Sequence, residues 1–414
     1  MTPSEFLWLL GALLVLSYAA DVLFHRTRVP AAVLLIAFGV LLGPVLKILP
    51  GTEFVRAAPY FGGLALVTIL FEGGMGLDLD ESIRGLASGT LLAALSFILT
   101  AGTIALLAHG ILGLPGPSAV ALGSLLGVPS SAVVLPVIGT LGLREGLRTR
   151  LVLDAAMADV LGILGVEIAI GALTGQSVSI LVLRSTVVGF AVGAAVAVGV
   201  GLVWSRYLRW AAGSSTMHLG EALTFGVALL LDGSVSAMGG AAAVAVVAFG
   251  VVLANEPVIM QRAFRREMPE QDVKRFEEMR GAIHRFMRQT TFVVLTFFFV
   301  FLGVVVDWKG ISLRTGAAAV AFAGICVLGR RAAIVGVNRV GLLTLSRDEL
   351  SNVAALFPRG LVTAVLAFEA MSANLPGSES FPLYAFVVLV VTNLAMVFSF
   401  QASRPGKPAL APAG

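Results

Sequence analysis

The chain has 414 residues, of which 58% are hydrophobic and 13% are charged, about half the charged share of a soluble domain. This composition excludes an ordinary soluble protein. The single cysteine, Cys326, lies in an apolar run, which excludes a disulfide framework and a cysteine-based metal site. The four histidines are scattered without ligand spacing, and the glycine pairs lie in apolar runs rather than after strands, which excludes a phosphate-binding loop. We therefore expect a membrane protein with no cofactor and no enzymatic activity.

Thirteen apolar runs follow one another along the chain, each close to the roughly 20 residues that a helix needs to cross a bilayer. The first run carries no small-residue cleavage site, so we expect it to remain as a span. The weakest boundary lies near 232–240, where only Asp232 and the Gly239-Gly240 pair separate two runs. The approximate limits are 5–24, 30–49, 60–78, 86–109, 116–140, 150–174, 180–203, 218–235, 237–255, 289–306, 315–338, 348–371 and 381–401.

The distribution of Lys and Arg orients these spans. With the N-terminus outside, 20 of the 28 basic residues fall in cytoplasmic segments, five fall outside and three lie within spans. Because basic loops stay on the cytoplasmic side, this ratio favours thirteen spans and a cytoplasmic C-terminus, in a bacterial inner (plasma) membrane. The net charge of +4 then reflects the anionic inner leaflet and not nucleic acid. The basic stretch 256–288 is predicted to be an amphipathic cytoplasmic connector on the membrane surface.

Two halves of the chain share short motifs in the same order. Ala37-Phe38-Gly39-Val40 recurs as Ala248-Phe249-Gly250-Val251, and Gly74, Asp78 and Pro129 recur as Gly303, Asp307 and Pro358 at an offset of 229. Spans 1–6 then pair with spans 8–13, and the single linking span 7 inverts the second copy. We predict an all-α polytopic membrane protein with two inverted six-helix repeats. Its predicted parts are a first repeat at 1–174, a linking span at 175–217, a second repeat at 218–401 that includes the connector, and a cytoplasmic tail at 402–414.

The repeat also places two prolines in corresponding spans. Pro129 and Pro358 lie near the middle of spans 5 and 12. Proline removes a backbone donor and disfavours the helical conformation of the residue before it, so both spans are expected to be broken. Broken helices in corresponding positions of two halves indicate an ion site near the middle of the membrane.

Ionisable side chains lie within several spans. Span 6 carries Asp154 and Asp159 on different faces, while Arg330 lies in span 11, Arg359 in span 12 and Glu72 in span 3. Such residues are costly in a membrane and mark ion or proton pathways. Because an unpaired buried charge is expensive, carboxylates and arginines should meet. A paired carboxylate stays ionised, whereas an unpaired one can hold either a proton or a dehydrated cation. The spacing does not show which aspartate has which role.

Four segments carry motifs that resemble one family. They are Phe71-Glu72-Gly73-Gly74 with Leu77-Asp78 in span 3, Arg148-Thr149 with Asp154-Ala155-Ala156-Met157-Ala158-Asp159 in span 6, Cys326 to Arg330 in span 11, and Pro358-Arg359-Gly360 in span 12. Together they resemble the NhaP-type and NHE-type sodium/proton antiporters of the monovalent cation/proton antiporter superfamily, over nearly the whole chain.

The resemblance implies a role for each of these residues. Asp159 would bind the cation or the proton, and Asp154 would form a structural ion pair with Arg330. Arg359 would stabilise the place where the two broken helices cross, and Glu72 would contribute through water. The resemblance further implies an elevator-like motion of a core bundle against a dimerisation bundle, and a homodimer in the lipid bilayer.

The chain departs from the family pattern at three places. Ala158 and Ala155 replace polar residues, and Gly127-Val128-Pro129 replaces a Thr-Asp-Pro sequence. Ser130 and Ser131 follow the proline and are candidates to supply oxygens instead. With Ala158 uncharged and Asp154 neutralised, Asp159 is the one free acid of span 6, which predicts electroneutral 1:1 exchange of Na⁺ or K⁺ for H⁺.

Three other functions remain open on the sequence. An organic-anion symporter on a related fold should lack the basic span 11 and the Pro-Arg-Gly motif. A channel or a regulated potassium-efflux system usually carries a soluble nucleotide-binding domain after the last span. A non-transporting or sensor-like protein derived from the antiporter fold is compatible with the three departures.

Overall fold

The computed structural model describes residues 3–27, 31–49, 51–173, 180–211, 220–264, 270–305 and 312–402. Outside the described residues lie the predicted tail beyond its first residue, residues 265–269 of the predicted connector, and residues 174–179 and 212–219 around the two ends of the predicted linking span (175–217). Every regular element within the described ranges is a helix.

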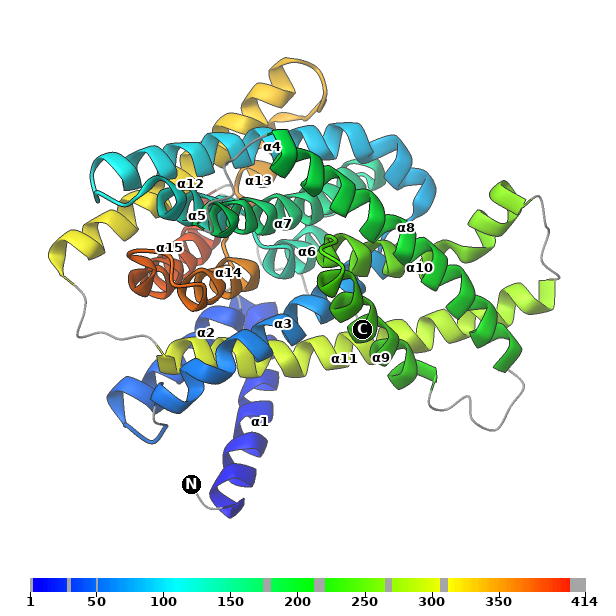
Figure 1. Ribbon diagram of the computed structural model, residues 1–414, viewed down its shortest axis with the longest axis horizontal. Coiled ribbons are helices and arrows are strands. Elements are labelled where there is room, and N and C mark those ends of the chain that lie inside the picture. The colour runs from blue at the N-terminus through cyan, green and yellow to red at the C-terminus, as the bar shows by residue number, and fades with distance from the viewer. Residues whose placement is uncertain are drawn as a thin grey trace.

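The helices follow one another as the apolar runs predict, and two of the predicted spans are each divided into two short helices (Figure 1). Their bounds are α1 Pro3–Thr27, α2 Ala31–Val40 continued by the π-helical turn η1 Leu41–Val45, α3 Gly51–Met75, α4 Leu79–Gly110, α5 Gly116–Gly127, α6 Ser131–Thr140, α7 Glu145–Leu173, α8 Ile180–Ala211, α9 Gly220–Ala237, α10 Ala242–Phe264, α11 Glu270–Val305, α12 Leu313–Arg339, α13 Arg347–Ala354, α14 Leu361–Ser372, the 3₁₀ turn η4 Ser378–Ser380, and α15 Phe381–Ala402.

Seven helices among the described residues are long and apolar enough to cross a membrane by length and composition. They comprise Ala87–Gly110, Gly146–Leu173, Ala191–Ala211, Ala242–Arg262, Phe276–Val305, Leu313–Arg339 and Ser378–Phe400. The prediction of an all-α integral membrane protein is therefore confirmed.

The weak boundary near 232–240 is a turn between two helices. α9 ends at Ala237 and α10 begins at Ala242. Gly239 has a φ of 71°, in the left-handed region that glycine adopts without steric cost. The Gly-Gly pair therefore provides the conformation that reverses the chain between these two helices.

The predicted connector does not form a separate helix. Its first residues complete α10, and its later residues form the first half of α11, which continues into the apolar half without a break. Phe276, Ile283 and Met287 are buried, and their spacing places them on one face of α11. Packing of this face extends the helix well before the apolar run that the sequence marks as a span.

The helices pack as two bundles. We call α4–α7 with α12–α15 the broken-helix bundle, and α1–α3 with α8–α11 the second bundle; contacts are extensive within each group. Figure 1 shows α11 running beneath the broken-helix bundle beside α2 and α3. Between the bundles, α14 packs against α3, where a Cβ built at Gly62 would lie 3.1 Å from a Val365 methyl. Phe301 of α11 also approaches Phe368 of α14, with ring centroids 6.4 Å apart.

Four glycines bring helix backbones of the second bundle together. α2 crosses α11 at Gly39 and Gly303, and a Cβ added to either glycine would collide with a backbone carbonyl of the opposite helix. α3 crosses α10 at Gly74 and Gly250, where an added Cβ would collide in the same way. These are the four glycines that recur in the two halves of the sequence, so the recurring positions are those that allow helices to approach closely.

Candidate ion-binding site at the crossing of two broken helices

The first broken span ends one helix and starts another within four residues. α5 ends at Gly127, Val128 and Ser130 are extended, and α6 begins at Ser131. Pro129 explains the break, because it pushes the preceding Val128 towards extended conformations. The break leaves the last carbonyls of α5 and the first N–H groups of α6 in the interior, without partners within their own helices.

The second broken span meets the first. α13 ends at Ala354 and α14 begins at Leu361, with Pro358 in the intervening segment. The Ser130 N–H donates to the Pro358 carbonyl at 2.8 Å. A Cβ at Gly360 would collide with the Ser130 side chain, so only glycine fits where the two segments cross. The structure thus brings together both prolines that the sequence singles out.

Arg359 binds the end of the first half-helix. Its guanidinium is fully buried, and it donates from Nε to the Leu126 carbonyl at 2.7 Å and from Nη2 to the Gly127 carbonyl at 3.2 Å. A cation at the C-terminus of a helix interacts favourably with the negative end of the helix dipole. The positive charge of Arg359 therefore compensates the buried carbonyls that the break at Pro129 leaves without partners in their own helix.

Two residues of α15 fix the backbone of Arg359. The Arg359 N–H donates to Thr392 Oγ1 at 3.0 Å, and Asn393 Nδ2 donates to the Arg359 carbonyl at 2.8 Å. Neither Thr392 nor Asn393 was predicted to act at the crossing. The only signal that they offer is two adjacent polar residues in an otherwise apolar span.

Asp154 and Arg330 form a buried ion pair. Each side chain is 1% exposed, and Arg330 Nη1 donates to Asp154 Oδ1 at 2.9 Å while Nη2 pairs closely with Oδ2. Arg330 Nε also donates to the Leu356 carbonyl at 3.2 Å, within the second helix break. The pair therefore joins α7 and α12 to the crossing segments.

Asp159 lies one and a half turns further along α7 in a different environment. Its side chain is fully buried, and Ser131 Oγ donates to Asp159 Oδ2 at 2.5 Å. Within the described residues, Asp159 Oδ1 and Ser130 Oγ have no hydrogen-bond partner. The carboxylate faces the first turn of α6, whose N-terminal dipole favours a negative charge. This arrangement can hold an ionised carboxylate that has a coordination position free.

Glu72 lies on the second bundle rather than at the carboxylate of Asp159. It is half-buried on α3, beside Thr291 and Arg288 of α11. Among the described residues the hydrogen bonds of Asp159 include Ser131 and not Glu72. The structure therefore brings Asp159 and both serines together, while the water-mediated role of Glu72 stays a prediction.

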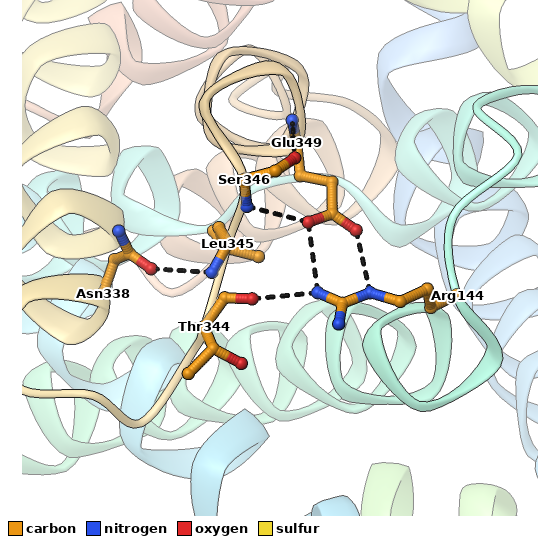
Figure 2. A network of polar contacts seen from close by, with 6 residues as sticks. All are labelled: Arg144, Asn338, Thr344, Leu345, Ser346 and Glu349. Carbon is orange, nitrogen blue, oxygen red and sulfur yellow. Dashed lines mark hydrogen bonds and ion pairs between the residues drawn. The ribbon is translucent and has the colours of Figure 1, made fainter.

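A polar network fixes the start of the second broken span (Figure 2). Ser346 and Glu349 form a capping box at the N-terminus of α13. Arg144, just before α7, donates to both Glu349 carboxylate oxygens at 3.0 and 3.1 Å and to the Thr344 carbonyl at 2.8 Å. Asn338 Oδ1 accepts from the Leu345 N–H at 2.9 Å. The network joins the loop between α6 and α7 to the loop between α12 and α13, and so keeps the two broken spans in register.

Comparison with known proteins places this fold and site in a family. Residues 11–400 match the family described as sodium/hydrogen exchanger, transmembrane. Two structures of the sodium proton antiporter MjNhaP1 from Methanocaldococcus jannaschii share the fold, with TM-scores of 0.68 and 0.71 and sequence identities of 21% and 20%. The alignments cover 97% of this chain in both cases, and 94% and 96% of those chains.

Curated relatives match over shorter segments. The K(+)/H(+) antiporter NhaP of Alkalimonas amylolytica is 28% identical over 193 residues, which are 44% of this chain and 33% of that protein. The Na(+)/H(+) antiporter 1 of M. jannaschii is 24% identical over 164 residues, 39% of this chain and 38% of the relative. The matched segments thus span about a third of each relative's length. The matched family is one of transporters, which agrees with the expectation that the protein is no enzyme.

Because the family model matches residues 11–400, the chain belongs to the transmembrane sodium/hydrogen exchanger family.

Proposed function

We propose that the protein is a secondary active antiporter that exchanges a monovalent cation for protons, and that Asp159 carries either one or the other. The observation that carries this proposal is a fully buried carboxylate that lies beside two helix breaks and has an oxygen free. Ionisable groups inside a membrane protein mark ion or proton pathways. Competition of a proton and a cation for one carboxylate is sufficient to couple the two fluxes.

The charges around the site support electroneutral 1:1 exchange. Arg330 neutralises Asp154, and Ala158 beside Asp159 carries no charge. One carboxylate is then left to bind one cation or one proton, so each half-cycle moves the same charge. We therefore propose that the transport cycle carries no net current.

The identity of the cation is open between Na⁺ and K⁺. The names of the two curated relatives specify K⁺ for one and Na⁺ for the other. At this site the candidate oxygens beside the carboxylate are the hydroxyls of Ser130 and Ser131. Neutral hydroxyl ligands add no charge, so they tune cation affinity without altering the stoichiometry.

We also propose thirteen spans arranged as two inverted repeats. The two glycine crossings support the repeat, because the second helix of each half packs on the third helix of the other. The two broken spans cross at equivalent prolines, as expected for a site at the middle of an inverted repeat. The basic residues favour an external N-terminus and a cytoplasmic C-terminus. We place the protein in a bacterial inner membrane as part of the same proposal.

The division into two bundles supports an elevator-type motion. The site lies within the broken-helix bundle, and the contacts between the bundles run largely along α14 and α3. Sliding at this interface would make Asp159 accessible first from one side of the membrane and then from the other. We propose that the second bundle stays fixed and forms a homodimer.

The experiment that tests the function is exchange by purified protein in proteoliposomes, driven by a pH gradient and compared for Na⁺, K⁺ and Li⁺. We expect an imposed gradient to drive uptake of at least one of these ions. Clamping the membrane potential at different values should leave the rate unchanged. A transport current would refute the 1:1 stoichiometry, and no exchange of any of the three ions would favour a non-transporting protein.

A further inference from the structure

One hydroxyl near the crossing has no evident structural purpose. Thr363 lies in the first turn of α14, its side chain is 1% exposed, and its Oγ1 has no hydrogen-bond partner within the described residues. Three other buried threonines, Thr68, Thr224 and Thr392, each donate to the carbonyl four residues earlier. For Thr363 that carbonyl belongs to Arg359, which lies before the helix and accepts from Asn393. A buried hydroxyl without a partner is unfavourable, so the Thr363 hydroxyl is available to bind a ligand.

The packing of α14 places this hydroxyl beside Asp159. A Cβ built at Gly162 of α7 would lie 3.5 Å from Leu366 Cδ1 of α14. Thr363 precedes Leu366 by three residues and Asp159 precedes Gly162 by three, so each lies on the same helix face as its contact, one turn earlier. The two helices run in the same direction here, because Gly360 at the start of α14 contacts Ser130, the neighbour of the serine that bonds Asp159.

The packing of α14 on α7 and on the first helix break therefore places three buried oxygens without partners on neighbouring helix faces. They are Asp159 Oδ1, Ser130 Oγ and Thr363 Oγ1. Each comes from a different element: the middle of α7, the break before α6 and the first turn of α14. The helices α6 and α14 both begin beside these oxygens. The positive ends of their dipoles disfavour a cation. Neutral oxygens are the groups that can offset this effect without altering the charge balance.

We infer that the Thr363 hydroxyl is a ligand of the transported monovalent cation, and that it completes with Ser130 the oxygen set around Asp159. This inference rests on the proposed function. It assigns to α14 a ligand that compensates for the alanines and the valine present where the family pattern has polar groups. When the cation leaves, the same hydroxyl lies free to donate a hydrogen bond to the carboxylate.

The test compares Thr363→Val with Thr363→Ser in proteoliposomes. Valine has nearly the shape of threonine and lacks the hydroxyl, whereas serine keeps it. We expect Thr363→Val to raise the half-saturating cation concentration about three- to tenfold, the effect of losing one neutral polar contact. Thr363→Ser should stay close to the parent. Because valine removes an unsatisfied buried hydroxyl, the thermal stability of Thr363→Val in detergent should equal or exceed that of the parent.

The stability measurement separates a ligand from a structural role. A structural threonine would lose stability on replacement by valine, and that result would overturn the inference. An unchanged half-saturating concentration in Thr363→Val would overturn it as well. Asp159→Asn, measured alongside, distinguishes a failure of the proposed function from a failure of the role of Thr363. If Asp159→Asn loses exchange while Thr363→Val behaves as the parent, the proposed function stands and the role of Thr363 fails. If Asp159→Asn exchanges like the parent, the proposed function itself fails.

Discussion

Replacing Asp159 by asparagine is expected to reduce pH-driven cation exchange to the background of protein-free liposomes. Asparagine is close in size to aspartate, but it can neither bind and release a proton nor supply a full negative charge to a cation. The fold should persist, because the substitution removes a buried charge. The amide oxygen of asparagine can still accept the hydrogen bond that the Ser131 hydroxyl donates. Exchange in proteoliposomes and thermal unfolding in detergent, measured on the same preparation, check both parts of the expectation.

A matched control is another acid of the helical interior. Asp232 of α9 is half-buried on the second bundle, away from the crossing of the broken helices. Asp232→Asn should retain exchange, because we expect the loss of exchange to depend on the position of the replaced acid and not on the total number of buried acids. Parental exchange by Asp159→Asn would show that the carrier carboxylate has been wrongly assigned.

The ion pair between Asp154 and Arg330 should behave in the opposite way, with a large effect on stability. Removing one partner leaves the other charge buried and uncompensated, which typically costs about 3–5 kcal/mol. We expect Asp154→Asn and Arg330→Met each to unfold at markedly lower temperature than the parent. The double variant should recover much of the loss, although the bond from Arg330 to the Leu356 carbonyl is not restored.

A double-mutant cycle of thermal unfolding measures this coupling. The pair between Arg144 and Glu349 is a suitable comparison, because the Arg144 side chain is 64% exposed and solvent weakens the interaction. Its coupling should be about 0–1 kcal/mol, as for surface pairs in general. Additive losses in Asp154→Asn and Arg330→Met would contradict a direct buried pair.

The fold could be predicted to a large extent, because the apolar composition of a single segment is enough to indicate a membrane helix. Apolar runs mark the helices, and Pro129 and Pro358 mark the places where two of them break. Even the weak boundary before α10 could be recognised from the Gly239-Gly240 pair. In the structure, Gly239 has the left-handed conformation that the turn requires. α11 was not foreseen at its full length, because the burial of Phe276 and Ile283 depends on helices that are distant in the sequence.

The site could be predicted as a set of charges but not as a set of contacts. Asp159, Asp154 and Arg330 are conspicuous because charged residues are rare in apolar runs. The main acceptors of Arg359 are backbone carbonyls, which every residue has, so no side-chain pattern reveals them. Thr363 is inconspicuous for a related reason. Threonines in apolar helices often bond their own backbone, whereas the carbonyl four residues before Thr363 lies outside α14.

Competition of cation and proton for Asp159 can be tested by the release of protons on cation binding, determined by calorimetry in buffers of different ionisation enthalpy. If cation and proton compete for Asp159, the parent protein should release one proton for each cation bound under conditions where the carboxyl is protonated. Asp159→Asn should bind the cation weakly and release none. Proton release of equal size from Asp159→Asn, or cation binding to the parent without release at any pH at which exchange occurs, would contradict the account.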